Sequence, residues 1–294
     1  IKRFALASSL ITFVLSAILL FQFDFSSAEK LQLGNKISWI KSINANYEIG
    51  IDGISLPLLV LSTFITVLAI IYSLEHLPEP KSPKGFLALI LVLETGMNGT
   101  FVALDLILFF VFFEIVLLPM YFMIGIWGDK TVRTVSGFKN QIETRLYASI
   151  KFFVFTLFGS AFMLLGFLGL YYRGNKTFSI PELIELGTSG AFTGTFATLV
   201  FAVLFLGFAV KVPMWPLHTW LPDAHTAAPT VGSVLLAAIL LKLGSYGFVR
   251  IAIPILPEQA KAWAPAIAIL SAIGIIYGSL ACLAQTDLKR LIAF

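Results

Sequence analysis

Long apolar runs separated by short polar links dominate the pattern of this chain. A helix needs about 17–25 apolar residues to cross a bilayer, and eight runs meet that length. They lie near residues 4–23, 54–74, 86–104, 105–127, 148–172, 194–217, 231–253 and 263–285. A backbone inside lipid must satisfy its own hydrogen bonds, which favours helices over strands. The pattern therefore predicts an all-α, polytopic transmembrane helix bundle of about eight spans in a single membrane domain, residues 1–294.

Two of the links are longer than the others. Residues 24–53 include Gly50 and Gly53, and we expect this extramembrane link to fold as a small hairpin. Residues 128–147 are polar and basic, and we expect them to form a cytoplasmic loop. Neither link is long enough to form a soluble domain of its own.

Basic residues in the links predict the orientation, because cytoplasmic links carry an excess of Lys and Arg. With the chain start in the cytoplasm, eleven basic residues lie on that side: Lys2, Arg3, Lys81, Lys84, Lys130, Arg133, Lys139, Arg145, Lys151, Lys289 and Arg290. Six lie on the opposite side: Lys30, Lys36, Lys41, Arg173, Lys176 and Lys261. The excess predicts a cytoplasmic start for the first span.

Composition supports the membrane interpretation. The chain is 58% hydrophobic and only 12% charged, with a mean hydropathy of +0.93, whereas soluble domains carry about 25% charged residues. The net charge of +4 does not indicate nucleic acid. The basic residues lie mainly in the links and form no stripe with interleaved aromatic side chains. Membrane lipid is therefore the expected surroundings.

Few residues are suited to hold a redox group. A single cysteine, Cys282, excludes a disulfide framework and a Cys-ligated iron–sulfur cluster. Three histidines are few for haem, and His218 and His225 share one Pro-rich segment. A metal site formed by His218, Asp223 and His225 is conceivable but disfavoured. We expect no catalytic redox site, metal or other cofactor on this chain.

Four charged residues stand inside the apolar runs: Glu94, Glu114, Lys211 and Lys242. A charge at the centre of a spanning helix costs roughly 2.5–3.5 kcal/mol even on insertion scales. The simplest common explanation is a polar track that carries protons or ions. The alternative is that these charges only hold helices together as buried pairs.

Glu114 lies near the middle of its run, with no polar residue within one turn. Burial favours the protonated carboxyl and a nearby lysine favours the charged one, so a moving partner allows proton loading and release. Pro119 is expected to bend the same helix and free a carbonyl. Glu94 is also central in its run, with Asn98 one turn later, and is an accessory candidate.

Lys211 precedes four prolines, at 213, 216, 222 and 229, which predict a broken helix with freed carbonyls along a wet cavity. A snorkelling role that reaches the headgroups remains open for this lysine. Lys242 lies closer to the centre of its run. There Gly244 and Gly247 permit close helix approach or local unwinding, and we expect a second broken helix.

His218 and His225 have ordinary pKa values near 6.5, which suits proton relay or structural hydrogen bonding. Asp223 is expected to cap the helix that follows it. Lys151 and Arg250 lie near the ends of their runs, where membrane anchoring is the favoured role for both. For Lys151 the alternative is a charge at the entry side of the path.

Four segments resemble one known family, the antiporter-like subunit M of respiratory complex I, the NADH-quinone oxidoreductase, called subunit 4 in mitochondria. They are YEIGIDGISLPLLVL (47–61), FFEIVLLPMYFMIGIWG (112–128), FAVKVPMWPLHTWLPDAHTAAPTVGSVLLAAILLKLGSYGFVR (208–250) and AQTDLKRLIAF (284–294). The stretch 208–250 is the most specific because it is long and ungapped. The resemblance covers almost the whole chain.

The resemblance implies roles for the candidate residues. Glu114 and Lys211 match a buried pair, Lys242 continues the path toward the membrane centre, and Glu94 matches a further intramembrane glutamate. Residues matching the histidines near His218 are associated with the connecting water chain. The subunit bears no flavin, haem or iron–sulfur cluster; quinone reduction occurs on partner subunits.

The resemblance also implies what surrounds the chain. Family members are longer at both ends, and the chain is expected to be a fragment holding the first part of an inverted-repeat antiporter-like fold. Its partners are other membrane-arm subunits, including sister antiporter-like subunits and a neighbour that supplies a lateral helix. The bacterial inner membrane is the favoured location, ahead of the mitochondrial inner and thylakoid membranes. Alternatives are a subunit of a multisubunit sodium/proton antiporter, a membrane-bound hydrogenase of the same superfamily, or a structural subunit that does not pump.

Overall fold

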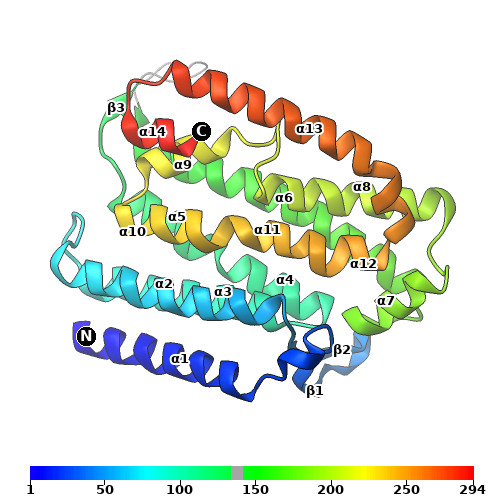
Figure 1. The fold of residues 1–294 in the computed structure, drawn as a ribbon. Coiled ribbons are helices and arrows are strands. Elements are labelled where there is room, and N and C mark those ends of the chain that lie inside the picture. Colours follow the sequence, from blue (N-terminus) through cyan, green and yellow to red (C-terminus); the bar gives the residue numbers. More distant parts are fainter. Residues whose placement is uncertain (134–141) are drawn as a thin grey trace.

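The computed structural model describes residues 1–133 and 142–294 as a bundle of long helices lying side by side (Figure 1). Eight helical stretches in the described part are long and apolar enough to cross a membrane. They are α1 (Lys2–Gln22), α2 (Ser55–Glu75), α3 (Pro83–Val102), α4 (Leu106–Ile115) with α5 (Leu117–Trp127), α6 (Thr144–Arg173), α8 (Gly194–Lys211), the stretch Thr230–Ile255, and α13 (Pro257–Leu283). The expected helix bundle with eight spans is confirmed.

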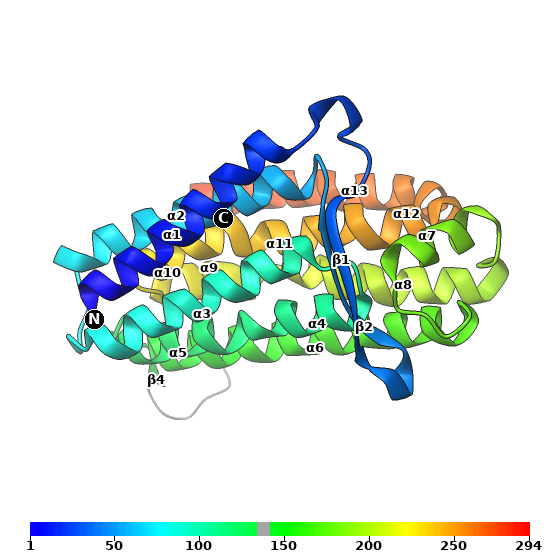
Figure 2. The same cartoon turned by 90° about the horizontal axis from the view of Figure 1, so that it is seen from below.

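The link between α1 and α2 folds as an antiparallel hairpin of β1 (Gln32–Ile40) and β2 (Ala45–Ile51). Short turns η1 (Phe25–Ser27) and η2 (Lys41–Ile43) flank β1. Figure 2 shows the hairpin crossing one end of the bundle. Asp105 fastens it there, because its carboxylate accepts the Asn46 backbone N–H at 2.9 Å and also caps the start of α4. The expected hairpin is therefore present.

The polar link after α5 begins and ends with a short strand pair, β3 (Val132–Arg133) and β4 (Ile142–Glu143). The expected cytoplasmic loop 128–147 includes residues 134–141, which lie outside the described part of the chain.

The helix that carries Glu114 is interrupted immediately after it. α4 ends at Ile115 and α5 begins at Leu117. Pro119 has no N–H to donate to the carbonyl of residue 115, so the regular ladder cannot continue through this turn. The expected bend therefore coincides with the start of α5.

The two expected helix breaks take different forms. After Lys211 the chain leaves helical geometry until α9 (Trp220–Ala227), in agreement with the proline pattern. Around Lys242 the helix stays continuous but loosens twice. Its order is α10 (Thr230–Leu235), π-helical η3 (Leu236–Leu240), α11 (Leu241–Gly247), π-helical η4 (Phe248–Ala252) and α12 (Ile253–Ile255). The second break is thus a pair of π segments and not a gap in the helix.

Two other run boundaries differ from the sequence pattern. The expected span 194–217 ends as a helix at Lys211, because Pro213 and Pro216 cannot extend it. The expected span 263–285 begins earlier, at Pro257, since proline is favoured in the first helical turn. Three short helices in the described part are not predicted by the pattern: α9, α7 (Ile180–Thr188) and α14 (Leu288–Ala293).

Small residues bring α6 and α8 into close contact. A Cβ atom added at Gly159 would lie 2.9 Å from the Val210 side chain, and one at Gly207 would lie 2.8 Å from Met163. Without a hydrophobic driving force in lipid, such close backbone approach is a principal source of helix association. The contact places the C-terminal end of α8, with Lys211, against the middle of α6.

Candidate functional site

Three polar residues from three helices meet in the middle of the bundle. Glu114 comes from the last turn of α4, Ser160 from α6 and Lys211 from the last turn of α8. The Glu114 carboxyl interacts with the Ser160 hydroxyl by hydrogen bonding and with Lys211 electrostatically. Two of the four charged residues that the sequence singled out are therefore neighbours, and Ser160 is a contact that sequence reasoning missed.

Lys211 lies in an aromatic and almost closed environment. Its side chain is only 3% exposed. The ammonium nitrogen lies 4.9 Å from the centre of the Phe113 ring and 5.9 Å from that of Phe152. Ring faces attract a cation more strongly when water is excluded. Snorkelling to the headgroups does not describe this lysine.

Glu114 and Lys211 interact without forming a direct ion pair. No nitrogen–oxygen distance of 4.0 Å or less joins them among the described residues. Charges beyond direct contact still interact in a low-dielectric interior. The Lys211 ammonium therefore lies over two ring faces and interacts with the Glu114 carboxyl from beyond ion-pair distance.

The break after Lys211 leaves helix carbonyls to be satisfied by other groups. The indole N–H of Trp220 donates to the Val210 carbonyl at 3.0 Å and anchors α9 beneath the end of α8. This contact brings the polar segment that follows the break back against the lysine-bearing turn. The Phe208 and Ala209 carbonyls accept the backbone N–H groups of Val212 and Met214, each at 2.9 Å, so the turn that follows α8 satisfies most of the carbonyls at this helix end.

Lys242 faces away from Lys211 in this structure. A Cβ added at Gly244 would lie 2.9 Å from both the Lys211 Cβ and the Val212 side chain, so this glycine face is the one packed on α8. Two residues along an α-helix correspond to about 200° of rotation. Lys242 is accordingly exposed, and its ammonium donates to the Ala237 carbonyl in η3 at 2.8 Å. The close approach expected at the glycines is confirmed.

Glu94 on α3 is 4% exposed, and one of its carboxyl oxygens has no hydrogen-bond partner among the described residues. Asn98, one turn later on α3, also has a buried side-chain oxygen without a partner there. Buried polar oxygens of this kind are commonly satisfied by ordered water. No ion pair in the described residues joins Glu94 to Lys211.

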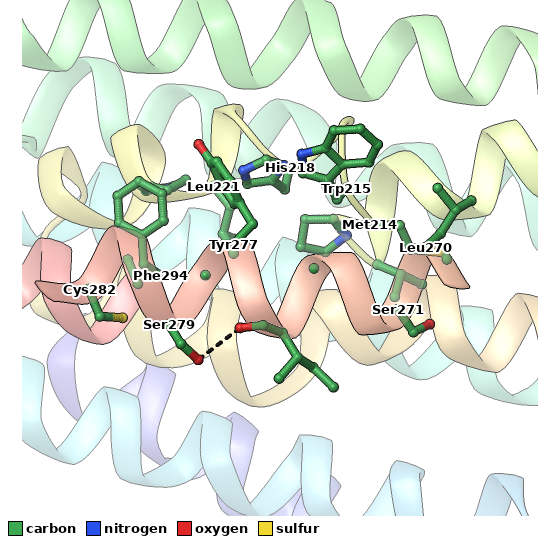
Figure 3. Close-up of a pocket in the computed structure, with 17 residues that line it drawn as sticks. Met214, Trp215, His218, Leu221, Leu270, Ser271, Tyr277, Ser279, Cys282 and Phe294 are labelled. Atoms are coloured by element: carbon green, nitrogen blue, oxygen red, sulfur yellow. Dashed lines mark hydrogen bonds between the residues drawn. The ribbon is translucent and has the colours of Figure 1, made fainter. Parts of the chain in front are cut away.

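His218 lies in the segment between α8 and α9 and lines a cavity of about 500 Å³ shared with α13. Figure 3 shows its ring between Trp215 and Tyr277, and the His218 and Tyr277 ring centres are 5.0 Å apart. Neither ring nitrogen has a partner among the described residues. Burial, with a smaller contribution from Lys151, lowers the pKa of His218 below its ordinary value. The imidazole is therefore neutral at pH 7 and able to accept or donate through water.

Lys151 and Asp223 form an ion pair that the sequence did not predict. The ammonium of Lys151 on α6 lies 2.8 Å from a carboxylate oxygen of Asp223 on α9. The expected anchoring of Lys151 in the headgroups is wrong, because its side chain turns inward to this carboxylate. The expected capping role of Asp223 is also wrong, because Asp223 lies inside the first turn of α9, after the N-cap residue Thr219. The two residues are 72 positions apart, which no local pattern reveals.

His225 lies in the same short helix but in a different environment. Burial, together with the nearby positive charge of Lys289, lowers the pKa of His225 to about 4. Its backbone carbonyl accepts the Ser233 hydroxyl at 3.0 Å, which ties α9 to α10. No group of three or more His, Cys, Asp or Glu residues in the described residues is placed to hold a metal ion.

Arg250 also differs from expectation. Its guanidinium does not point out of the bundle as an anchor, but bonds to the Asp52 carboxylate at 2.6 Å, with both side chains largely buried. The partner lies 198 positions away in the chain, just before α2.

Two family models match this chain. The model described as "NADH:quinone oxidoreductase/Mrp antiporter, TM" matches residues 103–294. The model described as "NADH-ubiquinone oxidoreductase chain 4, amino terminus" matches residues 2–100. Both candidate pairs, Glu114–Lys211 and Lys151–Asp223, lie within the first of these matches.

Curated relatives match over the whole chain. It is 42% identical over 294 residues to the NADH-quinone oxidoreductase subunit M of Rickettsia bellii, covering 99% of this chain and 55% of that protein. It is 43% identical to the subunit of the same name from Rhodobacter capsulatus and 42% identical to the NADH-ubiquinone oxidoreductase chain 4 of Arabidopsis thaliana, each covering 100% of this chain and 55% of the relative. The chain thus spans about half the length of the curated relatives it matches.

Solved structures share the fold. A chain of respiratory complex I from Thermus thermophilus with bound NADH superposes with a TM-score of 0.83 at 27% identity, covering 100% of this chain and 57% of that one. A chain of the Mrp complex from Dietzia sp. DQ12-45-1b gives a TM-score of 0.79 at 19% identity, covering 99% and 30%. At that lower identity the likeness concerns the fold alone.

Proposed function

We propose that this chain, which belongs to the NADH:quinone oxidoreductase/Mrp antiporter family, translocates protons as an antiporter-like membrane subunit of NADH-quinone oxidoreductase. The observation that carries the proposal is the position of Lys211. It is a lysine closed off from solvent, near Glu114 but not paired directly with it. A purely structural charge pair in lipid gains most from direct contact and full hydrogen bonding. A looser pair is better suited to exchange partners.

The access side of the path is proposed to lie around His218. Lys151 and Asp223 lie close enough to His218 for the lysine charge to act on its ring, and the cavity of about 500 Å³ leads along α13. A neutral imidazole can pass a proton by accepting at one nitrogen and releasing at the other. His225, with its strongly lowered pKa, is a poorer carrier at neutral pH and is proposed to support the position of α9.

The switching step is proposed to involve Lys211 and Glu114. When the ammonium moves away from Glu114, the carboxyl loses its positive neighbour and holds a proton more tightly. When the ammonium returns, the carboxyl releases that proton. One unit of proton affinity corresponds to about 1.4 kcal/mol, so a change of a few units is enough to couple to a conformational change elsewhere in a complex.

Lys242 is proposed to receive the proton on the far side of Lys211. Its ammonium lies on an exposed face of α11, bound only to the Ala237 carbonyl among the described residues. An uncovered lysine there would cost roughly 2.5–3.5 kcal/mol in lipid. We therefore propose that protein or confined water covers this face in the assembled complex. Glu94 is proposed to be an accessory to the same track.

The remaining parts of the activity are proposed to lie on other subunits. Flavin and iron–sulfur clusters, and the site of quinone reduction, belong on partners of the membrane arm. Those partners include sister antiporter-like subunits and a neighbour that contributes a lateral helix. The bacterial inner membrane is the proposed location, in keeping with the Rickettsia and Rhodobacter relatives.

The test is Glu114→Gln in the full-length subunit within the assembled complex. We expect a drop in protons moved per electron, because an amide cannot load a proton. The matched control is Glu185→Gln, on the exposed side of α7, which should leave pumping unchanged. Normal pumping in Glu114→Gln membranes, with normal assembly, would remove Glu114 from the mechanism. Sodium-dependent proton movement in proteoliposomes without NADH or quinone would favour the antiporter alternative instead.

A further inference from the structure

Arg250 and Asp52 form the most buried ion pair in the described residues. The guanidinium Nη2 lies 2.6 Å from Asp52 Oδ1, with side-chain exposures of 10% and 8%. The same arginine donates from Nε to the Tyr246 hydroxyl at 3.0 Å and lies over the Tyr246 ring. A guanidinium that engages two partners in this way is fixed in direction, which a lysine ammonium would not be.

Tyr246 connects Arg250 to α3. Its hydroxyl donates to the Phe101 backbone carbonyl at 2.7 Å, and the two rings meet edge to face at 5.2 Å. Phe101 lies in the last turn of α3, where carbonyls lack partners within the helix. The tyrosine is 2% exposed, so this hydrogen bond forms away from solvent.

Asp52 joins the same network to the hairpin and to α2. It directly follows β2, and Oδ1 accepts the backbone N–H groups of Ile54 at 3.0 Å and Ser55 at 2.9 Å. One carboxylate oxygen therefore caps α2 and binds the arginine. Four elements meet here: β2, α2, α3 and the helix that bears Lys242.

The position of the network gives it a consequence for Lys242. Arg250 lies inside η4, eight residues after Lys242, which corresponds to about 12 Å along a helix. Lys242 is bounded by η3 on one side and η4 on the other. A π segment holds one residue more than the equivalent α turns, and losing or shifting it rotates the helix beside it. The direction of Lys242 thus depends on where the two π segments are held.

We propose that Asp52, Tyr246 and Arg250 form a positioning clamp that fixes the rotation of the Lys242-bearing helix against α2, α3 and the hairpin. The clamp sets the direction of Lys242 through the backbone and does not handle protons itself. This inference rests on the proposed function only where it concerns pumping. The geometric part stands without it.

The geometric test measures the accessibility of residue 242, which depends on the direction of its side chain. A Lys242→Cys reporter is placed in a Cys282→Ser background, which removes the one cysteine of this chain, within the full-length subunit of the assembled complex. The rate of labelling by a small maleimide is compared with and without Arg250→Gln. We expect the rate to change by about tenfold or more, because breaking a buried pair leaves an uncompensated charge that the helix must move to relieve. A second reporter, Ile71→Cys on the exposed side of α2, should keep its rate.

Two further variants show whether a changed labelling rate reflects only misfolding. They are Arg250→Lys and the double exchange of Asp52→Arg with Arg250→Asp. Arg250→Lys keeps the charge but loses the second bond to Tyr246, and we expect an intermediate change in labelling. Partial return of the rate in the exchanged pair supports the clamp. An unchanged labelling rate of the Lys242→Cys reporter in all three backgrounds overturns it.

Pumping is measured separately, with Lys242 intact. We expect fewer protons per electron in Arg250→Gln at normal amounts of assembled complex. Altered labelling with normal pumping supports the geometric clamp and overturns its role in pumping. If instead Glu114→Gln also pumps normally, the proposed function fails while the labelling result still decides the geometry.

Discussion

At the scale of single residues, the strongest prediction concerns the proton on Lys211. Lys211→Arg keeps a positive charge near Glu114, but arginine does not release its proton in proteins. If the lysine must deprotonate in each cycle, the arginine variant should lose most pumping while the complex still assembles. Proton movement per electron in membrane vesicles is the measurement. Lys261→Arg, at an exposed position on α13, is the matched control. Full pumping in Lys211→Arg would indicate that Lys211 acts on Glu114 only through its positive charge.

A second residue-scale prediction concerns acid stability at Asp52. Burial alone would raise its pKa, but the hydrogen bonds from Arg250, Ser55 and Ile54 together lower it below the ordinary value. A lowered folded-state pKa adds stability above the unfolded pKa, about 3.9, and this stability is lost as the pH falls through the folded value. The free energy of unfolding of the wild type should therefore exceed that of Asp52→Asn by a constant amount from about pH 5 to pH 7. This difference should shrink below about pH 4. Thermal midpoints of the detergent-purified complex measure this, and a gap that widens in acid would contradict the assignment.

Sequence reasoning found charged residues whose cost in lipid is evident from their surroundings alone. Glu114 and Lys211 stand out because nothing polar accompanies them, and the structure brings them together. For Lys151 and Arg250, a position near the run ends favours anchoring, yet both pair inside the bundle. Their partners, Asp223 and Asp52, are 72 and 198 residues away. A pairing over such distances depends on how helices stack, which hydrophobic periodicity does not encode.

At the scale of elements, the contact between α8 and α11 leads to a prediction on packing. A Cβ added at Gly247 would overlap the Phe208 ring, closer than any unstrained contact. Gly247→Ala should therefore destabilise the subunit, by about 1–3 kcal/mol for overpacking. The thermal midpoint of the purified complex should fall accordingly. Gly232→Ala in α10 is the control, since its nearest atom is Pro229 Cδ at 3.4 Å, and an equal fall in both variants would contradict the packing argument.

The elements themselves were predictable wherever one local rule decides. Proline explains both the end of α8 and the interruption between α4 and α5, because it lacks the donor that a helix interior needs. The π segments η3 and η4 follow no such rule. They lie on either side of the Gly244 contact with Lys211, and η4 contains the arginine of the Asp52–Arg250 pair. Both of these contacts are tertiary.

At the scale of the whole molecule, the two ends of the bundle differ in what they carry. The hairpin, α7 and the start of α13 lie at one end in Figure 1, while the chain start, α9, α10 and α14 lie at the other. The Lys151–Asp223 pair lies at the second end and the Asp52–Arg250 pair at the first. The candidate track therefore lies between the proposed access region at one end and the proposed clamp at the other.

This polarity gives a prediction about orientation in the membrane. Among the described residues, ten Lys and Arg residues lie in or next to the links at the end with the chain start, against six at the hairpin end, so the hairpin should face away from the cytoplasm. Single cysteines at Ser38 in β1 and at Ser82 before α3 are introduced into the Cys282→Ser background. A membrane-impermeant thiol reagent applied to intact cells should label Ser38→Cys and spare Ser82→Cys, with the opposite result in inverted vesicles. The reverse pattern would place His218 and its cavity on the outer side, and protons would then have to enter the proposed path from the face where a pump releases them.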